Sequence, residues 1–344
     1  MKLKNIILTA AIAFLGFAAC SGDDKPTFPE QPVYDMAGFA KGADVSWLTE
    51  MEKSGNKFYD SAGHEKECMT LLRELGMNSI RLRVWVNPSD GWCNVNDLLV
   101  KAWRAKNMGF RILVDFHYSD IWADPGVQDK PDAWASLEFD ALKTAVANHT
   151  TEVLTRLKEN NIDVEWIQIG NETSDGMLWE DGKASKNMKD YAGLNNAGYD
   201  AAKAVYPDAK IIVHLNNGQS NTLYRWLFDG LKSNGGKWDV IGMSLYPAAG
   251  NWSELSAQCY NNMLDMAERY GSEVMLCEVG MPWDEADAAK LFLTDIIAKT
   301  KSIPDGKGLG VFYWEPQSYG GWKGYTQGAF DDSGKPTVAL DAFK

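Results

Sequence analysis

The sequence predicts an α/β protein whose eight parallel strands close into a (β/α)8 barrel, the TIM-barrel fold, in a single domain. Short, near-continuous apolar strands alternate with amphipathic helices, which indicates a parallel sheet covered on both faces. The 344 residues are 45% hydrophobic, enough for a barrel of about 250 residues. Gly76, Gly109 and Gly271 follow helical stretches, as C-terminal caps do. A doubly wound open sheet is the alternative, but no glycine-rich phosphate loop follows the first strand.

The first segment, residues 1–19, is predicted to be a lipoprotein signal peptide. Lys2 and Lys4 precede an apolar run over 6–19 that is too short to span a bilayer comfortably. Small residues and then Cys20 end the run, which resembles a lipobox, so Cys20 is the expected lipid anchor. The acidic stretch 21–25 resembles the export tag of surface lipoproteins in Gram-negative polysaccharide degraders. We therefore expect an outer-membrane lipoprotein facing the cell exterior; a secreted protein that loses Cys20 with its signal is the alternative.

An acidic, proline-containing linker over 20–36 is expected to join the anchor to a folded domain over 37–344. The net charge of −13, from 34 basic and 47 acidic residues, argues against the basic surface that nucleic acids or anionic membranes attract. We expect a monomer without a nucleic-acid partner that meets the membrane only through its anchor.

Four further cysteines, Cys68, Cys93, Cys259 and Cys277, have no spacing typical of a zinc site. Disulfide bonds are compatible with an exported protein, but the sequence leaves their pairing open. Cys277, inside an apolar strand, is expected to be a small core residue.

The predicted elements follow one another in strand–helix order. The strands are expected over 40–45, 79–84, 111–116, 165–169, 210–215, 240–244, 274–277 and 310–313. The helices are expected over 65–75, 94–107, 139–160, 188–205, 221–233, 252–270 and 285–302. No internal repeat interrupts this alternation.

Polar and aromatic side chains gather where the predicted strands end, which is where barrels carry their functional sites. They are Asp44, Ser46, Trp47, Arg81, Arg83, Trp85, Asn87, Asp115, His117, Tyr118, Asp120, Trp122, Asn171, Glu172, His214, Asn216, Tyr246, Glu278, Trp314 and Glu315. This pattern predicts a cleft across the mouth of the barrel. Fourteen Trp residues fit a sugar-binding cleft, because aromatic faces pack against pyranose rings.

Two carboxylates, Glu172 and Glu278, end the fourth and seventh predicted strands, and such a pair is the minimum apparatus for cutting a glycosidic bond. Retention of anomeric configuration needs the carboxyl groups about 5–5.5 Å apart, and inversion needs roughly 6.5–9.5 Å. The alternative for Glu172 alone is a solvated residue that caps the next helix.

Neighbouring residues predict different roles for the two carboxylates. Either Arg81 or Arg83 is expected to hold one of them ionised, and Tyr246 to donate a hydrogen bond to Glu278. Glu278 is then the nucleophile and Glu172 the acid/base. Asn171 is placed to bind a sugar 2-hydroxyl.

Each of these residues also has a purely structural interpretation. Either arginine can pair with a core carboxylate, and His117 and His214 can be satisfied core or rim residues. His117, Asp120 and Asp124 make a weak metal set, so no metal site is predicted. No G-x-S-x-G elbow is present, which argues against a serine hydrolase.

Several stretches resemble a known family. The Asn-Glu at 171–172 and Glu278 are similar to glycoside hydrolase clan A, the retaining barrel enzymes. More specific are 42–46, 81–88, 115–126 with Gln128, Pro131 and Trp134, and 308–316, which resemble glycoside hydrolase family 53, the endo-β-1,4-galactanases. The resemblance covers about 39–343.

The resemblance implies retaining endo-hydrolysis of β-1,4-galactan, the side chain of type I arabinogalactan in pectin. It implies Glu172 as acid/base and Glu278 as nucleophile. Together with the strand-end positions, it leads to a set of expected substrate-binding residues: Asp44, Arg81, Trp85, His117, Asp120, Trp122, Asn171, His214, Tyr246 and Trp314. A β-mannanase or cellulase, and a non-catalytic glycan-binding lipoprotein, are the competing interpretations.

The sequence departs from the family after Glu278 and after Pro316. Some bacterial members carry a longer, Asp-rich loop after the seventh strand that binds calcium, and here Pro282 and Glu285 follow quickly. We therefore expect no cofactor and no calcium site, and the shorter loops imply a different product size.

Overall fold

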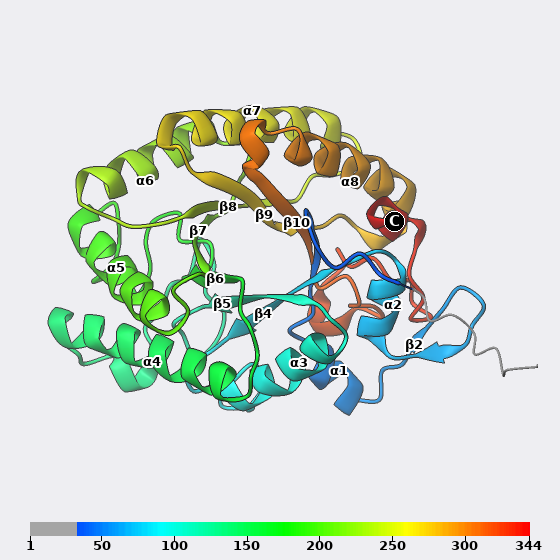
Figure 1. Ribbon diagram of the computed structural model, residues 1–344, viewed down its shortest axis with the longest axis horizontal. Coiled ribbons are helices and arrows are strands. Elements are labelled where there is room, and N and C mark those ends of the chain that lie inside the picture. The colour runs from blue at the N-terminus through cyan, green and yellow to red at the C-terminus, as the bar shows by residue number, and fades with distance from the viewer. Residues whose placement is uncertain (1–32) are drawn as a thin grey trace, which may run out of the picture. The chain divides into compact units, whose positions relative to one another are not determined.

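A computed structural model of the protein describes residues 33–344 (Figure 1). The predicted signal peptide, the anchor Cys20 and the linker as far as residue 32 lie outside the described residues. Residues Tyr34–Lys344 form one compact unit. Among the described residues, none of the helices combines the length and apolar character needed to cross a bilayer.

Eight strands of the described chain form the closed parallel barrel that the sequence predicts (Figure 1). Each strand pairs with its neighbours in chain order, and β1 closes the ring by pairing with both β10 and β4. The barrel strands are β1 (Ala40–Asp44), β4 (Ser79–Val84), β5 (Arg111–Phe116), β6 (Trp166–Ile169), β7 (Lys210–Leu215), β8 (Val240–Leu245), β9 (Glu273–Val279) and β10 (Gly308–Trp314).

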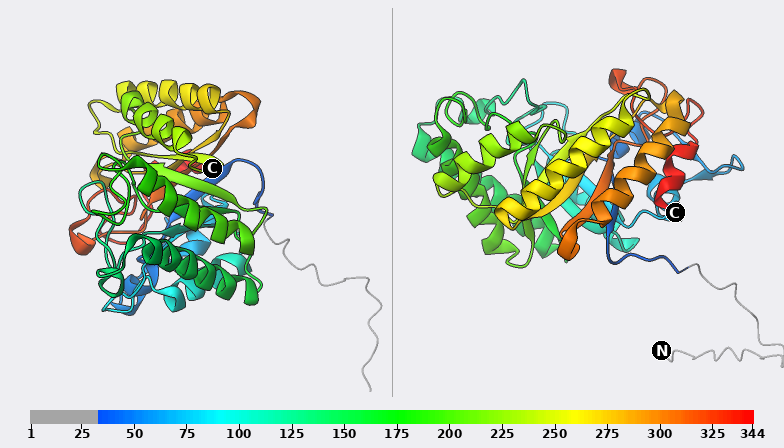
Figure 2. Two further views of the ribbon diagram at one scale, coloured as in Figure 1. Left: turned by 90° about the vertical axis from the view of Figure 1, so that its left-hand side faces the viewer. Right: turned by 90° about the horizontal axis from the view of Figure 1, so that it is seen from above.

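Helices surround the barrel and cover its outer face, as two further views show (Figure 2). They are α1 (Leu48–Lys53), α2 (Cys68–Glu74), α3 (Val95–Asn107), α4 (Phe139–Glu159), α5 (Met188–Val205), α6 (Asn221–Ser233), α7 (Trp252–Tyr270) and α8 (Ala286–Lys301). Short 3-10 turns lie at Asp132–Trp134, Trp283–Glu285, Pro304–Gly306, Trp322–Gly324 and Val338–Phe343.

The helix predicted over 65–75 is wrong at its start. Residues 65 and 66 form strand β3 (Glu65–Lys66), which pairs antiparallel with β2 (Phe58–Tyr59). The helix begins after Glu67, whose side chain accepts a 2.6 Å hydrogen bond from the Thr70 amide and so caps it. Helix α1 and the β2–β3 hairpin were not predicted, because both are too short to show a periodic pattern.

The core has two layers, which explains the composition of the strands. An outer layer packs between the barrel and the helices, and an inner layer fills the barrel around Trp166 and Phe312, whose rings lie 6.1 Å apart. Phe312 fits only because its neighbour is Gly42, where an added Cβ would lie 2.2 Å from the ring. The predicted apolar strand bodies therefore serve two separate packing surfaces.

Strand β4 alternates in a way that prepares the site. Ile80, Leu82 and Val84 pack outward into the helix-facing layer, while Arg81 and Arg83 belong to the opposite face and are fully buried. Two buried cations on one strand require buried anions nearby, because an unpaired charge in a protein interior is very costly.

All four cysteines of the described chain are buried and free of disulfide bonds. Cys277 belongs to the inner layer of the barrel, which confirms its prediction as a core residue.

Candidate active site

A cleft of about 340 Å³ lies at the mouth of the barrel, and both candidate catalytic carboxylates line it. The lining is contributed by the ends of barrel strands and by the segments that follow them. It consists of Trp47, His117, Trp122, Ala123, Asp124, Asn171, Glu172, Tyr246, Glu278, Trp314 and Lys323.

Glu172 reaches the cleft because the chain turns sharply after strand β6. Gly170 and Glu172 both have positive φ, of 79° and 46°, and the Thr173 amide then bonds to the carbonyl of His214 at 2.8 Å. A Cβ at position 170 would lie 2.5 Å from the Thr173 side chain, so glycine is required there. The turn brings the Glu172 carboxyl from the end of a core strand into the cleft.

Glu278 reaches the cleft through an irregularity in strand β9. Met243 on β8 pairs with Leu276, but the next residue, Ser244, pairs with Glu278, so β9 carries one extra residue. Cys277 points into the inner core, and regular alternation would turn Glu278 outward toward the helices. The bulge re-aims Glu278 to the inside, a common use of bulges near active sites.

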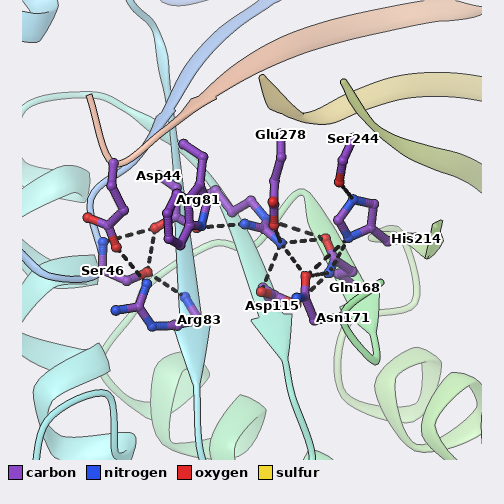
Figure 3. Close-up of polar contacts among 12 residues, drawn as sticks. Asp44, Ser46, Arg81, Arg83, Asp115, Gln168, Asn171, His214, Ser244 and Glu278 are labelled. Carbon is purple, nitrogen blue, oxygen red and sulfur yellow. Dashed lines mark hydrogen bonds and ion pairs between the residues drawn. The ribbon is translucent and has the colours of Figure 1, made fainter. Parts of the chain in front are cut away.

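Arg81 is the electrostatic centre of the site (Figure 3). Its guanidinium lies 2.7 Å from Asp44 Oδ2, 2.8 Å from Asp115 Oδ2 and 2.9 Å from Glu278 Oε1. It also donates to the side-chain oxygens of Gln168 and Asn171. Of the two arginines that the sequence left open, Arg81 is therefore the one that contacts a candidate catalytic carboxylate.

The environments of the two carboxyl groups differ. The Tyr246 hydroxyl donates a 2.8 Å hydrogen bond to Glu278 Oε2, and Arg81 contacts the other oxygen of that carboxylate. Within residues 33–344, no Lys, Arg or His side chain lies within ion-pair distance of the Glu172 carboxyl. A cation and a hydroxyl donor thus favour the ionised form of Glu278.

Burial raises the pKa of both carboxyl groups. For Glu172, the hydroxyl of Ser244 and the charge of Arg81 partly oppose this rise in pKa. For Glu278, burial and the nearby Glu172 charge raise the pKa to about 8 against the effects of Arg81 and Tyr246. Because each carboxylate disfavours ionisation of the other, the two groups titrate as a coupled pair.

His117 lines the cleft, but both of its ring nitrogens are used internally. Nδ1 accepts hydrogen bonds from the Ala123 amide at 3.1 Å and the Trp85 indole at 3.3 Å. Nε2 therefore carries the proton and donates to Asp115 at 3.0 Å. His117 can meet a ligand only through the C–H edge of its ring.

Asn171 is held in one orientation. Its Oδ1 accepts from Arg81 at 3.0 Å, and its Nδ2 donates to the Ala123 carbonyl at 2.8 Å. This leaves the second N–H of the amide without a partner among the described residues, and Asn171 lines the cleft.

Aromatic rings form one wall of the cleft. Trp47, Trp122 and Trp314 contact one another edge to face at centroid distances of 5.1 to 5.9 Å. Beneath them the Arg83 guanidinium lies 4.4 Å from the Trp122 ring and 2.5 Å from Glu315 Oε1. Arg83 therefore supports the wall rather than a candidate catalytic carboxylate.

The structure divides the predicted site residues into two groups. Lining the cleft are Glu172, Glu278, His117, Trp122, Asn171, Tyr246 and Trp314. Outside the lining, but in contact with it or with each other, are Asp44, Arg81, Trp85 and His214. Asp120 is also outside the lining, where it accepts hydrogen bonds from the Asn87 and Asp132 amides and braces two loops.

The expected catalytic and substrate-binding residues did not include several participants in the site. Trp47, Asp124 and Lys323 line the cleft, and Asp115 and Gln168 hold Arg81. Trp47 and Asp115 do stand at strand ends, which was the available signal. Lys323 lies far along a loop after β10, so its place could not be read from strand ends.

Within the described part of the chain, no group of three or more His, Cys, Asp or Glu residues is arranged to hold a metal ion. The expectation of a metal-free site stays a prediction, which dialysis against a chelator tests.

Comparison with known proteins identifies the family. The sequence pattern of Glycosyl hydrolase family 53 matches residues 40–291. The chain belongs to this family. A relative, "Arabinogalactan endo-beta-1,4-galactanase A" of Aspergillus niger, is 33% identical over 299 residues, covering 80% of this chain and 84% of that protein. A protein of Niallia circulans, described only by its position in the bgaB 5′ region, is 35% identical over 308 residues, covering 81% of this chain and 83% of that protein.

Solved structures of family 53 agree with the fold. One of two fungal β-1,4-galactanases superposes with a TM-score of 0.82 at 28% identity, over 89% of this chain and 99% of that one. The family 53 catalytic domain of Ignisphaera aggregans gives a TM-score of 0.81 at 32% identity, over 92% and 97%. Xylanase A of P. fluorescens subsp. cellulosa, at 16% identity and a TM-score of 0.62, shares the fold alone.

Proposed function

We propose that this protein is a retaining endo-β-1,4-galactanase that cleaves the galactan chains of type I arabinogalactan. The main support for the proposal is that the two carboxyl groups of one cleft have different neighbours. Arg81 and Tyr246 contact Glu278, whereas no cation contacts Glu172 in the described chain. Membership of a family whose named relatives are arabinogalactan galactanases supports the substrate.

The first step requires a protonated Glu172 and an ionised Glu278, and the contacts of Arg81 and Tyr246 with Glu278 favour this distribution. In this step Glu172 gives its proton to the leaving glycosidic oxygen while Glu278 attacks the anomeric carbon. In the second step ionised Glu172 takes a proton from water, which attacks the same carbon and frees Glu278. Glu172 thus acts as acid and then as base, and Glu278 as nucleophile.

The remaining lining fits a neutral sugar chain. The free N–H of Asn171 is available for a hydroxyl oxygen next to the reacting carbon. Trp122 and Trp314 are half-buried, and their rings offer apolar faces or edges to pyranose C–H groups.

The test is digestion of linear β-1,4-galactan, with β-mannan and cellulose as competing substrates. We expect mixed oligosaccharides from galactan first, and little release from the other two. Glu172→Gln should reduce the rate on galactan by about 10²- to 10⁴-fold, the usual contribution of a general acid. Glu159→Gln, an exposed site at the end of α4, is the control and should leave the rate unchanged. Preference for mannan or cellulose, or binding of galactan without cleavage by wild-type protein, would contradict the proposal.

We also propose that Cys20 tethers the enzyme to the outer membrane. The support is the sequence pattern of two lysines, an apolar run and small residues before Cys20. Cys20→Ser should move the protein from the membrane fraction to the soluble fraction. Equal partition of wild type and variant would argue against the anchor.

A further inference from the structure

Lys323 lines the cleft, and the two-carboxylate mechanism gives it no role. It belongs to the 3-10 turn Trp322–Gly324, in the loop that follows β10. Among the described residues that line the cleft, it is the one lysine or arginine. Its side chain is 37% exposed, so a ligand in the cleft can reach its ammonium group.

The loop that carries Lys323 is attached to the rest of the molecule on both sides of this residue. Before it, Tyr319 Oη donates a 2.9 Å hydrogen bond to the carbonyl of Lys57 and accepts one from the Lys57 amide at 3.1 Å. After it, the Tyr325 ring packs on the Trp314 ring of the cleft wall, with the centroids 4.7 Å apart. These contacts give Lys323 a defined place at the cleft.

The backbone at Lys323 has a conformation that favours glycine. Its φ is 49°, and the glycines on either side of the turn, Gly321 and Gly324, have φ of 67° and 78°. A side chain is sterically disfavoured in this region, and such outliers are concentrated at functional sites. A lysine at this position therefore indicates that its side chain is used.

An ion pair holds the ammonium group of Lys323. Its Nζ lies 2.7 Å from Oε2 of Glu50 in α1, and the Glu50 side chain is only 14% exposed. An ammonium group has three N–H donors, and one oxygen occupies one of them. Glu50 is the one ion-pair partner of Lys323 within residues 33–344, so donors remain for a ligand.

These donors suit a neutral hydroxyl better than an anion. The carboxyl groups of Asp124, Glu172 and Glu278 line the same cleft, and Glu50 already balances the charge of Lys323. An anionic ligand would be repelled by ionised carboxyl groups. The hydroxyl oxygen of a sugar accepts a hydrogen bond from a cation without adding charge.

The order of the strands places Lys323 on the side of the sugar that the enzyme retains. In the ring of strands β10 lies opposite β6, which leads to Glu172, and next to β9, which carries Glu278. In the proposed reaction the leaving sugar departs at Glu172, while the retained sugar is bonded to Glu278. The rest of the retained chain therefore extends away from β6, toward the loop after β10.

We propose that Lys323 is a specificity-determining residue that donates a hydrogen bond to a hydroxyl group on the non-reducing side of the cleaved bond. Because Lys323 lies on a loop and not at a strand end, the sugar unit that it contacts is beyond the one that reacts. Glu50 is a positioning residue that holds the ammonium group in place. The inference rests on the proposed galactanase function.

The first test locates the bond that is cut in galactopentaose labelled at its reducing end. Lys323→Met removes the donors and keeps an unbranched side chain. Binding modes with several units on the non-reducing side then lose a contact, so we expect cuts to move toward the non-reducing end and give longer labelled products. The value of kcat/KM should fall about 3- to 10-fold, the contribution of one hydrogen bond, mainly through a higher KM.

The matched control is Lys237→Met. Lys237 also forms a 2.7 Å ion pair, with Asp200, but it lies just before β8 begins and so at the end of the barrel away from the mouth. It should change neither the cutting pattern nor KM. Lys323→Arg keeps a cation that can pair with Glu50 and donate, and should retain most of the wild-type pattern. Thermal unfolding of each variant checks folding.

A second measurement does not depend on activity. Calorimetry should show that galactopentaose binds about 3- to 10-fold more weakly to the double variant Glu172→Gln with Lys323→Met than to Glu172→Gln alone. Equal binding, or a cutting pattern that is unmoved or moves toward the reducing end, overturns the proposal. Wild-type protein that binds galactopentaose without cutting it contradicts the proposed function instead, and the calorimetric comparison still decides the role of Lys323.

Discussion

The charged side chains at this site depend on one another, and Arg81 is the clearest example. One buried cation contacts three carboxylates, Asp44, Asp115 and Glu278. Desolvating each charge is costly, and the contacts offset that cost only while every partner is present. The Arg81 contact therefore favours the ionised form of Glu278, and the buried network tolerates little change at Arg81.

Arg81→Met should lower the free energy of unfolding by about 3–5 kcal/mol, because it leaves buried carboxylates without their cation. Urea denaturation monitored by circular dichroism measures the change. Arg269→Met is the matched control, since Arg269 pairs with Asp229 at 2.7 Å on the surface, and should cost less than about 1 kcal/mol. Equal losses in the two variants would mean that the buried network contributes no more than a surface pair.

The residue types at the site and the Tyr246–Glu278 hydrogen bond were predictable, but most of the other partners were not. Glu172, Glu278 and Tyr246 stand at strand ends, and a barrel brings all strand ends to one face. Which arginine meets Glu278 depends on distances across the barrel, which no local pattern contains. The hydrogen bonds that use both nitrogens of His117 likewise combine Asp115 on β5 with Ala123 after that strand and Trp85 after β4, a combination that no local pattern shows.

At the level of elements, the bulge in β9 determines whether the Glu278 side chain faces the cleft. Strand β9 alternates between the inner and outer cores until Cys277, and Glu278 joins the cleft only because one residue is inserted relative to β8. A pattern of apolar residues predicts the strand but not the insertion, since both Cys277 and Glu278 face inward there.

Gly242→Ala should disturb this bulge. A Cβ at position 242 would lie 2.7 Å from both Cys277 Sγ and Ile212 Cγ2, so we expect a loss of about 1–3 kcal/mol of stability and a lower kcat. Gly250→Ala, with nothing within 4 Å of the added carbon, should change stability by less than about 0.5 kcal/mol.

Adding Cys277→Ala to Gly242→Ala removes one of the two clashing atoms. The double variant should recover part of the lost kcat, measured on galactan with folding checked by thermal melts. If Gly242→Ala behaves like Gly250→Ala, the packing behind Glu278 does not control its position.

At the scale of the whole molecule, the barrel separates stability from function. The inner layer around Trp166 and Phe312 and the helix-facing layer supply the apolar core, and the polar network occupies the mouth. Because parallel strands all end at that mouth, residues from β1 to β10 can converge on one cleft. The fold was predictable because strands and helices alternate eight times along the chain, and each of these elements has a local pattern of apolar residues.

In the proposed mechanism Glu172 and Glu278 hydrolyse galactan by double displacement, with two successive inversions at one carbon. Proton NMR of linear β-1,4-galactan during the first minutes of digestion, before mutarotation, measures the anomeric form of the new reducing ends. We predict β-configured ends that later equilibrate with the α form. New ends that first appear as α would contradict the account, because they would require a single displacement by water.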